Sequence, residues 1–120
     1  MISLAHVVAL LIAVESGNQP NPPDGDGGLA VGVLQIHPIV IADVNRITGR
    51  TLWSLEDRRN KERSEAICAT YLDYYGGAYQ RETGKQPTLE VYCRMWDGGP
   101  VGWKKKATLP YWKKVQALLK

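Results

Sequence analysis

The chain has 120 residues, of which 44% are hydrophobic and 22% are charged, and these values exclude a disordered chain or a coiled coil. The length allows one hydrophobic core, so we expect residues 1–120 to form a single domain. The net charge is only +3 and no nucleic-acid-binding motif accompanies it, so we expect no nucleic-acid partner.

The first predicted element is a buried helix over residues 2–15. This run contains no Gly or Pro and is apolar nearly all round, which is typical of a helix enclosed on every side, and Gly17 predicts its end. The run is too short to span a bilayer and lacks the basic segment and cleavage site of a signal peptide. We therefore expect no membrane insertion, and synthesis in the cytoplasm without a signal peptide.

Residues 17–36 predict an irregular segment. Its first part, residues 17–28, is rich in Gly, Pro and Asn, which excludes helix and predicts turns or a short hairpin. Residues 29–36 predict an extended or short helical return, in which Gly32 permits a close approach of another backbone.

Further helices are predicted along the rest of the chain from caps and amphipathic spacing. Pro38 opens one that ends at Gly49, and Thr88 caps another. The other predicted helices cover residues 60–75, with a stop at Gly76-Gly77, residues 89–96 and about residues 110–119. A turn is predicted at residues 97–100. The predicted class is α+β, mainly α, with four to five helices, a central buried helix and a small hairpin or loop.

The two cysteines, Cys68 and Cys93, are too few to indicate the disulfide framework of a small secreted domain, so we expect free thiols. The end of the chain is rich in lysine and has no acidic residue after Asp97. The lysines in this part are Lys104, Lys105, Lys106, Lys113, Lys114 and Lys120. Such a face is either a solvated helix surface or a contact for a polyanion.

Glu15 is the most informative candidate for chemistry. It follows a long apolar run and precedes a loop, which predicts a carboxyl at the rim of a core. Partial burial disfavours the charged form and raises the pKa, as a general acid requires. The alternative is an ordinary glutamate at a helix end.

A second carboxylate is expected from the glycine-rich loop, where Asp24 and Asp26 lie. Glycine-rich turns keep an aspartate solvated and ionised, and glycoside cleavage uses one protonated and one ionised carboxyl. Either aspartate could equally be a plain turn residue.

Gln35 and His37 alternate, so an extended backbone would point both side chains to one face that could line a sugar cleft. His37 could instead cap a helix or lie in the core. The two His and two Cys show no spacing typical of zinc ligands, so neither a metal nor another cofactor is expected.

Two sequence blocks carry a resemblance to a known family. AVESGNQPNPPDGDGGLAVGVLQIHP resembles the lysozyme superfamily pattern of Glu-Ser-Gly, a glycine-rich Asp loop and Gly-x-Leu-Gln-Ile. It is similar both to invertebrate-type lysozymes and to lytic transglycosylase domains of bacteria and phages. CRMWDGGPVGWKK followed by LPYWKKV resembles the Arg-x-x-Asn-Gly-Gly-Pro-x-Gly block and later Tyr-Trp of the invertebrate type. The blocks cover about residues 10–40 and 92–116.

The resemblance implies a lysozyme-like fold and a role for Glu15 as catalytic acid. It matches Asp26 to the second carboxylate, with Asp24 in reserve. The expected substrate contacts are Asp24, Gln35, His37, Trp96, Asp97, Gly98 and Gly99. Asp97 departs from the family, which usually has Asn there, so a neutral donor and acceptor is replaced by an anion. The animal enzymes are rich in disulfides, so the few cysteines imply a bacterial or phage origin.

The expected activity is that of a muramidase, hydrolysing the β-1,4 bond between N-acetylmuramic acid and N-acetylglucosamine in the bacterial cell wall. The expected partner is therefore the peptidoglycan glycan strand, bound by a monomer, after phage-type release or delivery. Two alternatives stay open at this stage. One is a lytic transglycosylase that leaves 1,6-anhydromuramoyl ends, and the other is a non-catalytic wall-binding module, for which Asp97 is the only hint.

Overall fold

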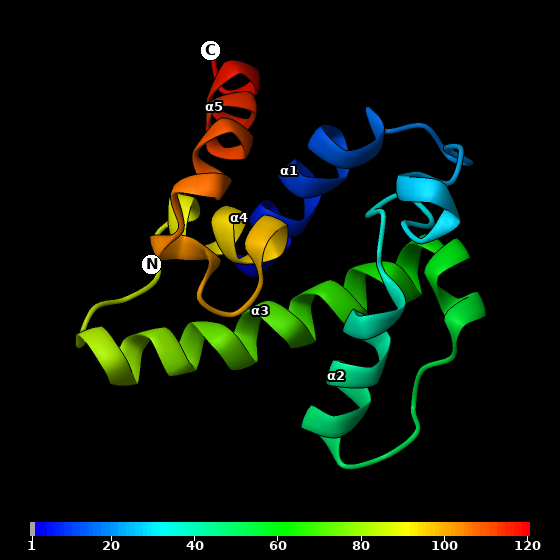
Figure 1. Ribbon diagram of the computed structural model, residues 1–120, viewed down its shortest axis with the longest axis horizontal. Coiled ribbons are helices and arrows are strands. Elements are labelled where there is room, and N and C mark those ends of the chain that lie inside the picture. The colour runs from blue at the N-terminus through cyan, green and yellow to red at the C-terminus, as the bar shows by residue number, and fades with distance from the viewer. Residues whose placement is uncertain (1) are drawn as a thin grey trace.

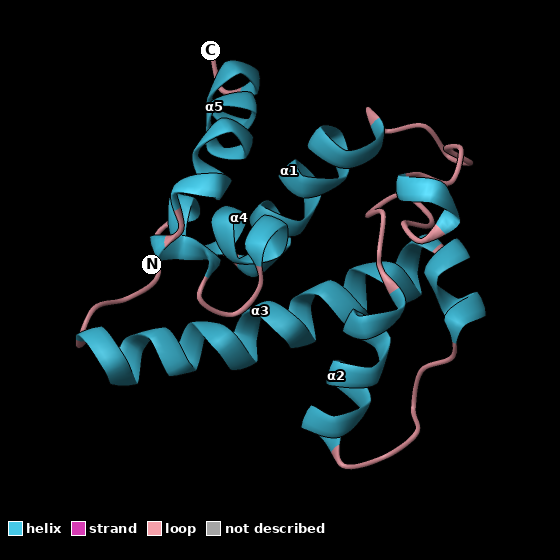
Figure 2. Ribbon diagram, viewed as in Figure 1, coloured by secondary structure: helices cyan, strands magenta, loops and turns pink. Residues whose placement is uncertain are grey.

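The computed structural model describes residues 2–120, which form five α-helices joined by loops and short 3-10 helices (Figures 1 and 2). The α-helices are α1 (Leu4–Ser16), α2 (Pro38–Thr48), α3 (Lys61–Thr83), α4 (Leu89–Gly98) and α5 (Leu109–Leu118). No strand forms within residues 2–120. The mainly helical class is therefore confirmed, whereas the small hairpin is not.

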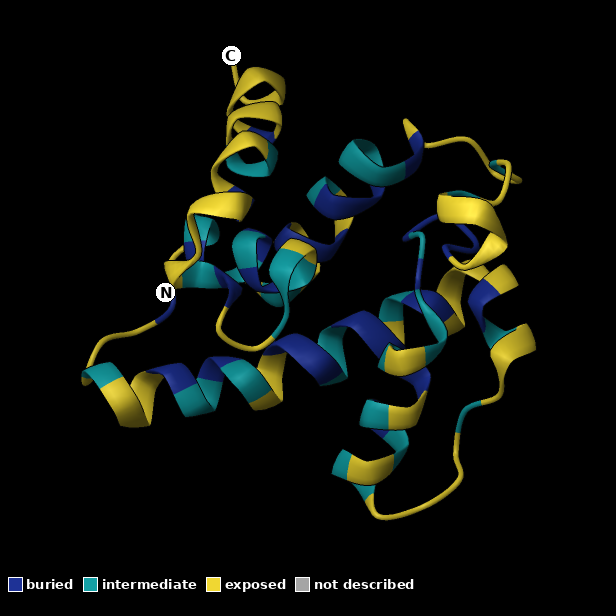
Figure 3. Ribbon diagram, viewed as in Figure 1, coloured by how far each residue is buried: buried dark blue, intermediate teal, exposed yellow. Residues whose placement is uncertain are grey.

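The long helix α3 is the element on which the others pack. It contacts α1, α2 and α4, while α5 lies against α1 and α4 (Figure 1). The buried side chains of these helices meet in one hydrophobic cluster, and the face of α3 turned toward α1 and α4 is buried along much of its length (Figure 3). Cys68 and Cys93 lie in this cluster as free thiols, as predicted.

Helix α1 ends where the sequence predicted, because Gly17 adopts the left-handed conformation that terminates it. Its expected burial on every side is wrong. Val7 and Leu11 are fully buried, but His6 and Ala9 are exposed. The contacts of α1 come from α3, α4 and α5, which cover one side and leave the other open to solvent. No helix within residues 2–120 has both the length and the apolar character needed to cross a membrane.

The segment between α1 and α2 is a folded loop. It contains one 3-10 helix, η1 (Asp26–Gly28), and two isolated antiparallel bridges, Gly25 with Ala30 and Val31 with Ile36. The bridges take the place of the expected hairpin, because glycines and residues with positive φ keep the chain turning between them.

A buried arginine holds this loop against the rest of the chain. The guanidinium of Arg58, from the 3-10 helix η2 (Leu55–Arg59), donates hydrogen bonds of 3.0 Å to the carbonyls of both Leu29 and Ile36. Gly32 packs so closely that a Cβ there would collide with the carbonyl oxygen of Arg58. The predicted close backbone approach at Gly32 is thus confirmed.

Helix α3 does not stop at Gly76-Gly77, so that prediction is wrong. The helix continues to Thr83 and ends at Gly84 in the left-handed conformation. Gly76 does not end the helix but allows α4 to pack closely against it, because a Cβ at this position would lie only 2.9 Å from the Tyr92 ring of α4. Contact with α4 therefore outweighs the low helix propensity of glycine.

Helices α2 and α4 begin at the residues that the sequence predicted as their caps. Pro38 lies in the first turn of α2 and Gly49 terminates it, and the Thr88 hydroxyl accepts a hydrogen bond from the Val91 amide at the start of α4. The predicted turn at residues 97–100 begins later than expected, since α4 runs on to Gly98 and Gly99 leaves the helix with a φ of +93°. Asp97 therefore belongs to the last turn of α4.

Candidate active site

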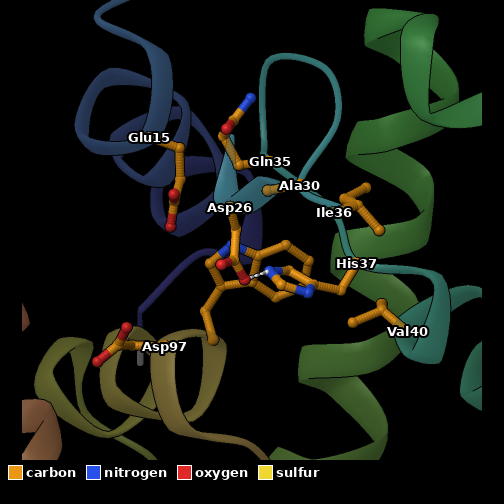
Figure 4. Close-up of a pocket in the computed structure, with 9 residues that line it drawn as sticks. Glu15, Asp26, Ala30, Gln35, Ile36, His37, Val40 and Asp97 are labelled. Atoms are coloured by element: carbon orange, nitrogen blue, oxygen red, sulfur yellow. Dashed lines mark ion pairs between the residues drawn. The ribbon is translucent and has the colours of Figure 1, made fainter. Parts of the chain in front are cut away.

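A cleft of about 300 Å³ lies where the end of α1, the folded loop, the start of α2 and the end of α4 meet. Its lining residues are Glu15, Asp26, Ala30, Gln35, Ile36, His37, Val40, Trp96 and Asp97. In Figure 4, Glu15 and Asp97 lie on one side of the cleft and His37 and Val40 on the other, with Asp26 between them. Six of the predicted site residues are thus brought together from four separate segments of the chain.

Glu15 lies in the last turn of α1 with its carboxyl turned into the cleft (Figure 4). The Tyr111 hydroxyl of α5 donates a hydrogen bond of 2.6 Å to Oε2 of Glu15. Burial raises the pKa of Glu15 from 4.5 to about 7, and this effect outweighs the Tyr111 hydrogen bond, which lowers it. Glu15 therefore keeps a substantial protonated fraction near neutral pH.

Two charged groups act on Glu15 in opposite directions. The carboxylate of Asp97 raises the pKa of Glu15 by repulsion, whereas the Lys114 ammonium lowers it. Burial also raises the pKa of Asp97, and Lys114 lowers it. Asp97, which stands where the resemblance leads us to expect Asn, thus adds an anion that favours the protonated form of Glu15.

Asp26 begins η1 and has a φ of +50°, a conformation uncommon outside glycine. Its side chain is 67% exposed, and its Oδ2 lies 3.3 Å from Nε2 of His37 (Figure 4). The cleft therefore combines a partly buried carboxyl, Glu15, with an exposed one, Asp26. His37 holds the solvated carboxyl from the opposite wall.

Gln35 reaches the cleft by a different route from the one predicted. Its φ is +50°, so the chain is not extended there and the expected alternation with His37 is wrong. The Gln35 amide donates a hydrogen bond of 2.9 Å to the carbonyl of Gly32, and a Cβ at Gly25 would collide with the Gln35 side-chain oxygen. The side chain is thus fixed by the turns of the loop, and both Gln35 and His37 line the cleft.

Three other predicted site residues do not line this cleft. Asp24 is paired with Arg59 at 3.1 Å, and this hydrogen-bonded pair lowers the pKa of Asp24. Gly98 packs against the methyl group of Thr108, and Gly99 borders a separate hollow beside α2. Glycine is needed at residue 98 because a Cβ there would collide with that methyl group.

Sequence reasoning missed Tyr111 as a partner of Glu15. The two residues are separated by 96 positions, and only packing of α5 against α1 brings them together. The available signal was the Tyr-Trp pair in LPYWKKV, which the resemblance matched without assigning it a role. Within residues 2–120 no group of three or more His, Cys, Asp or Glu side chains is placed to hold a metal ion.

Comparison with solved structures shows the fold. A chain in the crystal structure of Aeromonas hydrophila PliI in complex with Meretrix lusoria lysozyme matches with a TM-score of 0.73, over 93% of this chain and 87% of that chain. The sequence identity is 22%, and the complex contains two different proteins. The match therefore establishes the arrangement of the helices and not an activity.

Comparison of sequences shows the family. No family model matches the chain. Invertebrate-type lysozyme 6 of Caenorhabditis elegans is 33% identical over 99 residues, which cover 79% of this chain and 71% of the nematode protein. The bacterial or phage origin expected from the cysteine content stays a prediction. On this sequence relationship, the chain belongs to the invertebrate-type lysozyme family.

Proposed function

We propose that this protein is a muramidase that hydrolyses the β-1,4 bond between N-acetylmuramic acid and N-acetylglucosamine in peptidoglycan. The observation that carries the proposal is the pair of unlike carboxyls in one cleft, with Glu15 partly buried and hydrogen-bonded to Tyr111, and Asp26 exposed beside His37. Glycoside hydrolysis needs this asymmetry, because one carboxyl must donate a proton while the other is an anion.

In this mechanism Glu15 protonates the glycosidic oxygen as the bond to the muramic acid ring breaks. Its pKa of about 7 keeps the proton available at the pH of the reaction. The Asp26 carboxylate stabilises or captures the positive charge that develops on the sugar, and water then completes the hydrolysis. Gln35 supplies a donor and an acceptor for sugar hydroxyl or N-acetyl groups.

Substitution of Glu15 tests the assignment. Glu15→Gln keeps the shape of the side chain and its capacity to accept from Tyr111, but it removes the transferable proton. We expect the loss of peptidoglycan clearing by at least about 100-fold, with an unchanged circular dichroism spectrum. Retention of wild-type clearing by this variant would exclude Glu15 as the acid.

Product masses separate hydrolysis from the transglycosylase alternative. A hydrolase adds water at each cleaved bond, whereas a lytic transglycosylase leaves 1,6-anhydromuramoyl ends that are one water lighter. We expect hydrated ends from the wild-type protein and a strong loss of activity in Asp26→Asn. Anhydro products together with an active Asp26→Asn variant would favour the transglycosylase.

A wall-binding module without activity is the remaining alternative, and the anion at residue 97 is the feature that favours it. It predicts sedimentation of the protein with purified walls and no release of reducing ends. The proposed site of action is the bacterial cell wall, reached by release or delivery, with the protein acting as a monomer.

A further inference from the structure

A second hollow adjoins the cleft on the side of α2. It has a volume of about 470 Å³, and we call it the side groove, defined by Ile39, Val40, Arg46, Tyr71, Tyr75 and Pro100. Val40 lines both the cleft and the side groove. The Tyr71 ring also meets the Trp96 ring of the cleft edge-on, with 5.6 Å between the ring centroids. A ligand that fills the cleft can therefore continue into the side groove past Val40.

The walls of the two hollows differ in chemistry. The cleft presents polar side chains, among them Glu15, Gln35 and His37. The side groove is walled mainly by aliphatic and aromatic carbon, and Ile39 at its rim is 75% exposed. Sugar rings need hydrogen-bonding partners for their hydroxyl groups, and the polar groups on this wall, Asp43, Arg46 and Tyr75, are bonded to one another. The side groove therefore fits a ligand with methyl groups better than it fits a further saccharide.

Charge is confined to one part of the side groove. Arg46 contacts Asp43 at 2.7 Å, and the Tyr75 hydroxyl donates a hydrogen bond of 2.5 Å to the same carboxylate. Nη2 of Arg46 also donates to the Tyr75 hydroxyl at 3.1 Å. The Arg46 side chain is still 59% exposed, so a carboxylate in the groove can reach its guanidinium. Asp43 is only 21% exposed and already accepts hydrogen bonds from Arg46 and Tyr75, so the cluster offers a cation beside an apolar wall.

We propose that the side groove binds the peptide stem that branches from the muramic acid residue of peptidoglycan. This inference rests on the proposed function, because the branch point must lie at the cleft. The stem is attached to the sugar ring whose glycosidic bond is cleaved, so it leaves the cleft close to the reacting atoms. Its alanine methyl groups match the wall around Ile39 and Tyr71, and its carboxylates match the exposed guanidinium of Arg46. The groove thereby selects strands that carry stems.

Two soluble substrates test this assignment: glycan strands that carry stems, and the same strands after an amidase has removed the stems. The variants are Ile39→Ser, which removes apolar wall, and Arg46→Ala, which removes the cation. We expect each to lower kcat/KM on stem-bearing strands by about 5- to 10-fold, mainly through KM, and to change it less than about 2-fold on bare strands.

The controls are exposed side chains of the same chemical kind that do not line the side groove. Arg63→Ala breaks a comparable surface pair, since Arg63 is 61% exposed and lies 2.9 Å from Asp57. Leu118→Ser removes an apolar side chain that is 53% exposed on α5. Both controls should behave as wild type on both substrates. Equal losses on the two substrates in the groove variants would show that the groove holds sugar rings and would overturn the proposal, as would no loss on either.

A binding measurement separates this proposal from the proposed function. A free stem tetrapeptide is titrated into the labelled wild-type protein, and amide chemical shifts are followed. Shifts at Ile39, Arg46 and Tyr71 that are absent in Arg46→Ala support the groove whether or not strands are cleaved. Shifts confined to other regions, or none at millimolar peptide, would overturn it. Failure to cleave either strand would count against the muramidase alone.

Discussion

The hydroxyl of Tyr111 lies 2.6 Å from Oε2 of Glu15 and joins the last helix of the chain to the end of the first. This hydrogen bond stabilises the charged form of the carboxyl, whereas burial disfavours that form and has the larger effect. The acidity of Glu15 is thus set by a balance between burial, which raises its pKa, and Tyr111 of α5, which lowers it.

Removal of the hydroxyl should shift this balance toward the protonated acid. In Tyr111→Phe the pKa of Glu15 rises, so the alkaline limb of kcat/KM against pH should move up by about 0.5 to 1 unit. Stability should fall by about 1 kcal/mol, because one buried hydrogen bond is lost. Tyr74→Phe, at an exposed tyrosine, is the control and should leave the profile unchanged. A downward shift in Tyr111→Phe would contradict the balance.

The two charges beside Glu15 should produce opposite shifts. Asp97→Asn removes a repelling anion, so the pKa of Glu15 falls and the alkaline limb moves to lower pH. Lys114→Gln removes an attracting cation, so the limb moves to higher pH. Both shifts should shrink as the salt concentration rises, because partly exposed charges are screened. Lys113→Gln is the matched control on α5. If the alkaline limbs of Asp97→Asn and Lys114→Gln moved in the same direction, the opposite effects assigned to these two charges would be refuted.

Stability should also depend on the ionisation of Glu15. Its pKa is raised from 4.5 to about 7 on folding, so within this interval the unfolded chain is ionised while the folded chain keeps its proton. The stabilising contribution of the protonated form is therefore complete below pH 4.5 and is lost as the pH rises toward 7. Above pH 7, Glu15→Gln should be more stable than the wild type by about 3 kcal/mol.

Urea unfolding of both proteins at several pH values measures this difference. We expect the two curves of unfolding free energy against pH to meet near pH 4 and to diverge between pH 5 and 7. Parallel curves over the whole range would mean that the carboxyl is not desolvated by folding.

A pair of glycines in the loop separates steric fit from backbone conformation. Gly32 and Gly27 both have a positive φ, but a Cβ at Gly32 would strike the Arg58 carbonyl, whereas one at Gly27 meets no atom within 4 Å. Gly27→Ala should cost about 1 kcal/mol from backbone strain alone, and Gly32→Ala about 3 kcal/mol or more. Thermal unfolding gives both values, and equal costs would mean that the loop yields easily around Arg58.

The sequence carried enough information to predict the helical parts whose ends are marked by local chemistry. Gly17, Pro38 and Thr88 act through their own backbone or side chain, and the helices begin or end beside them. Gly76 misled the prediction because its neighbour is Tyr92 of another helix, and no local rule contains that contact. Helix ends were therefore predictable where the cause is local and not where it is tertiary.

The residues of the candidate site were likewise predictable only where their role has a local cause. Glu15 and Asp26 could be proposed from an apolar run and a glycine-rich loop, because both patterns have local physical consequences. The contribution of Tyr111 depends on how α5 packs on α1, and the position of Asp24 outside the cleft depends on its pairing with Arg59 across 35 positions. Both pairings lower the pKa of a carboxyl, and they became visible only in the folded chain.

The guanidinium of Arg58 reaches across from η2 to two carbonyls of the loop that carries the cleft residues. Carbonyl oxygens are neutral, so this attachment does not depend on the ionisation of a carboxylate partner, as a salt bridge would. Acid that discharges the surface aspartates and glutamates leaves it in place. The loop can thus keep its shape at a pH at which ordinary ion pairs have already come apart.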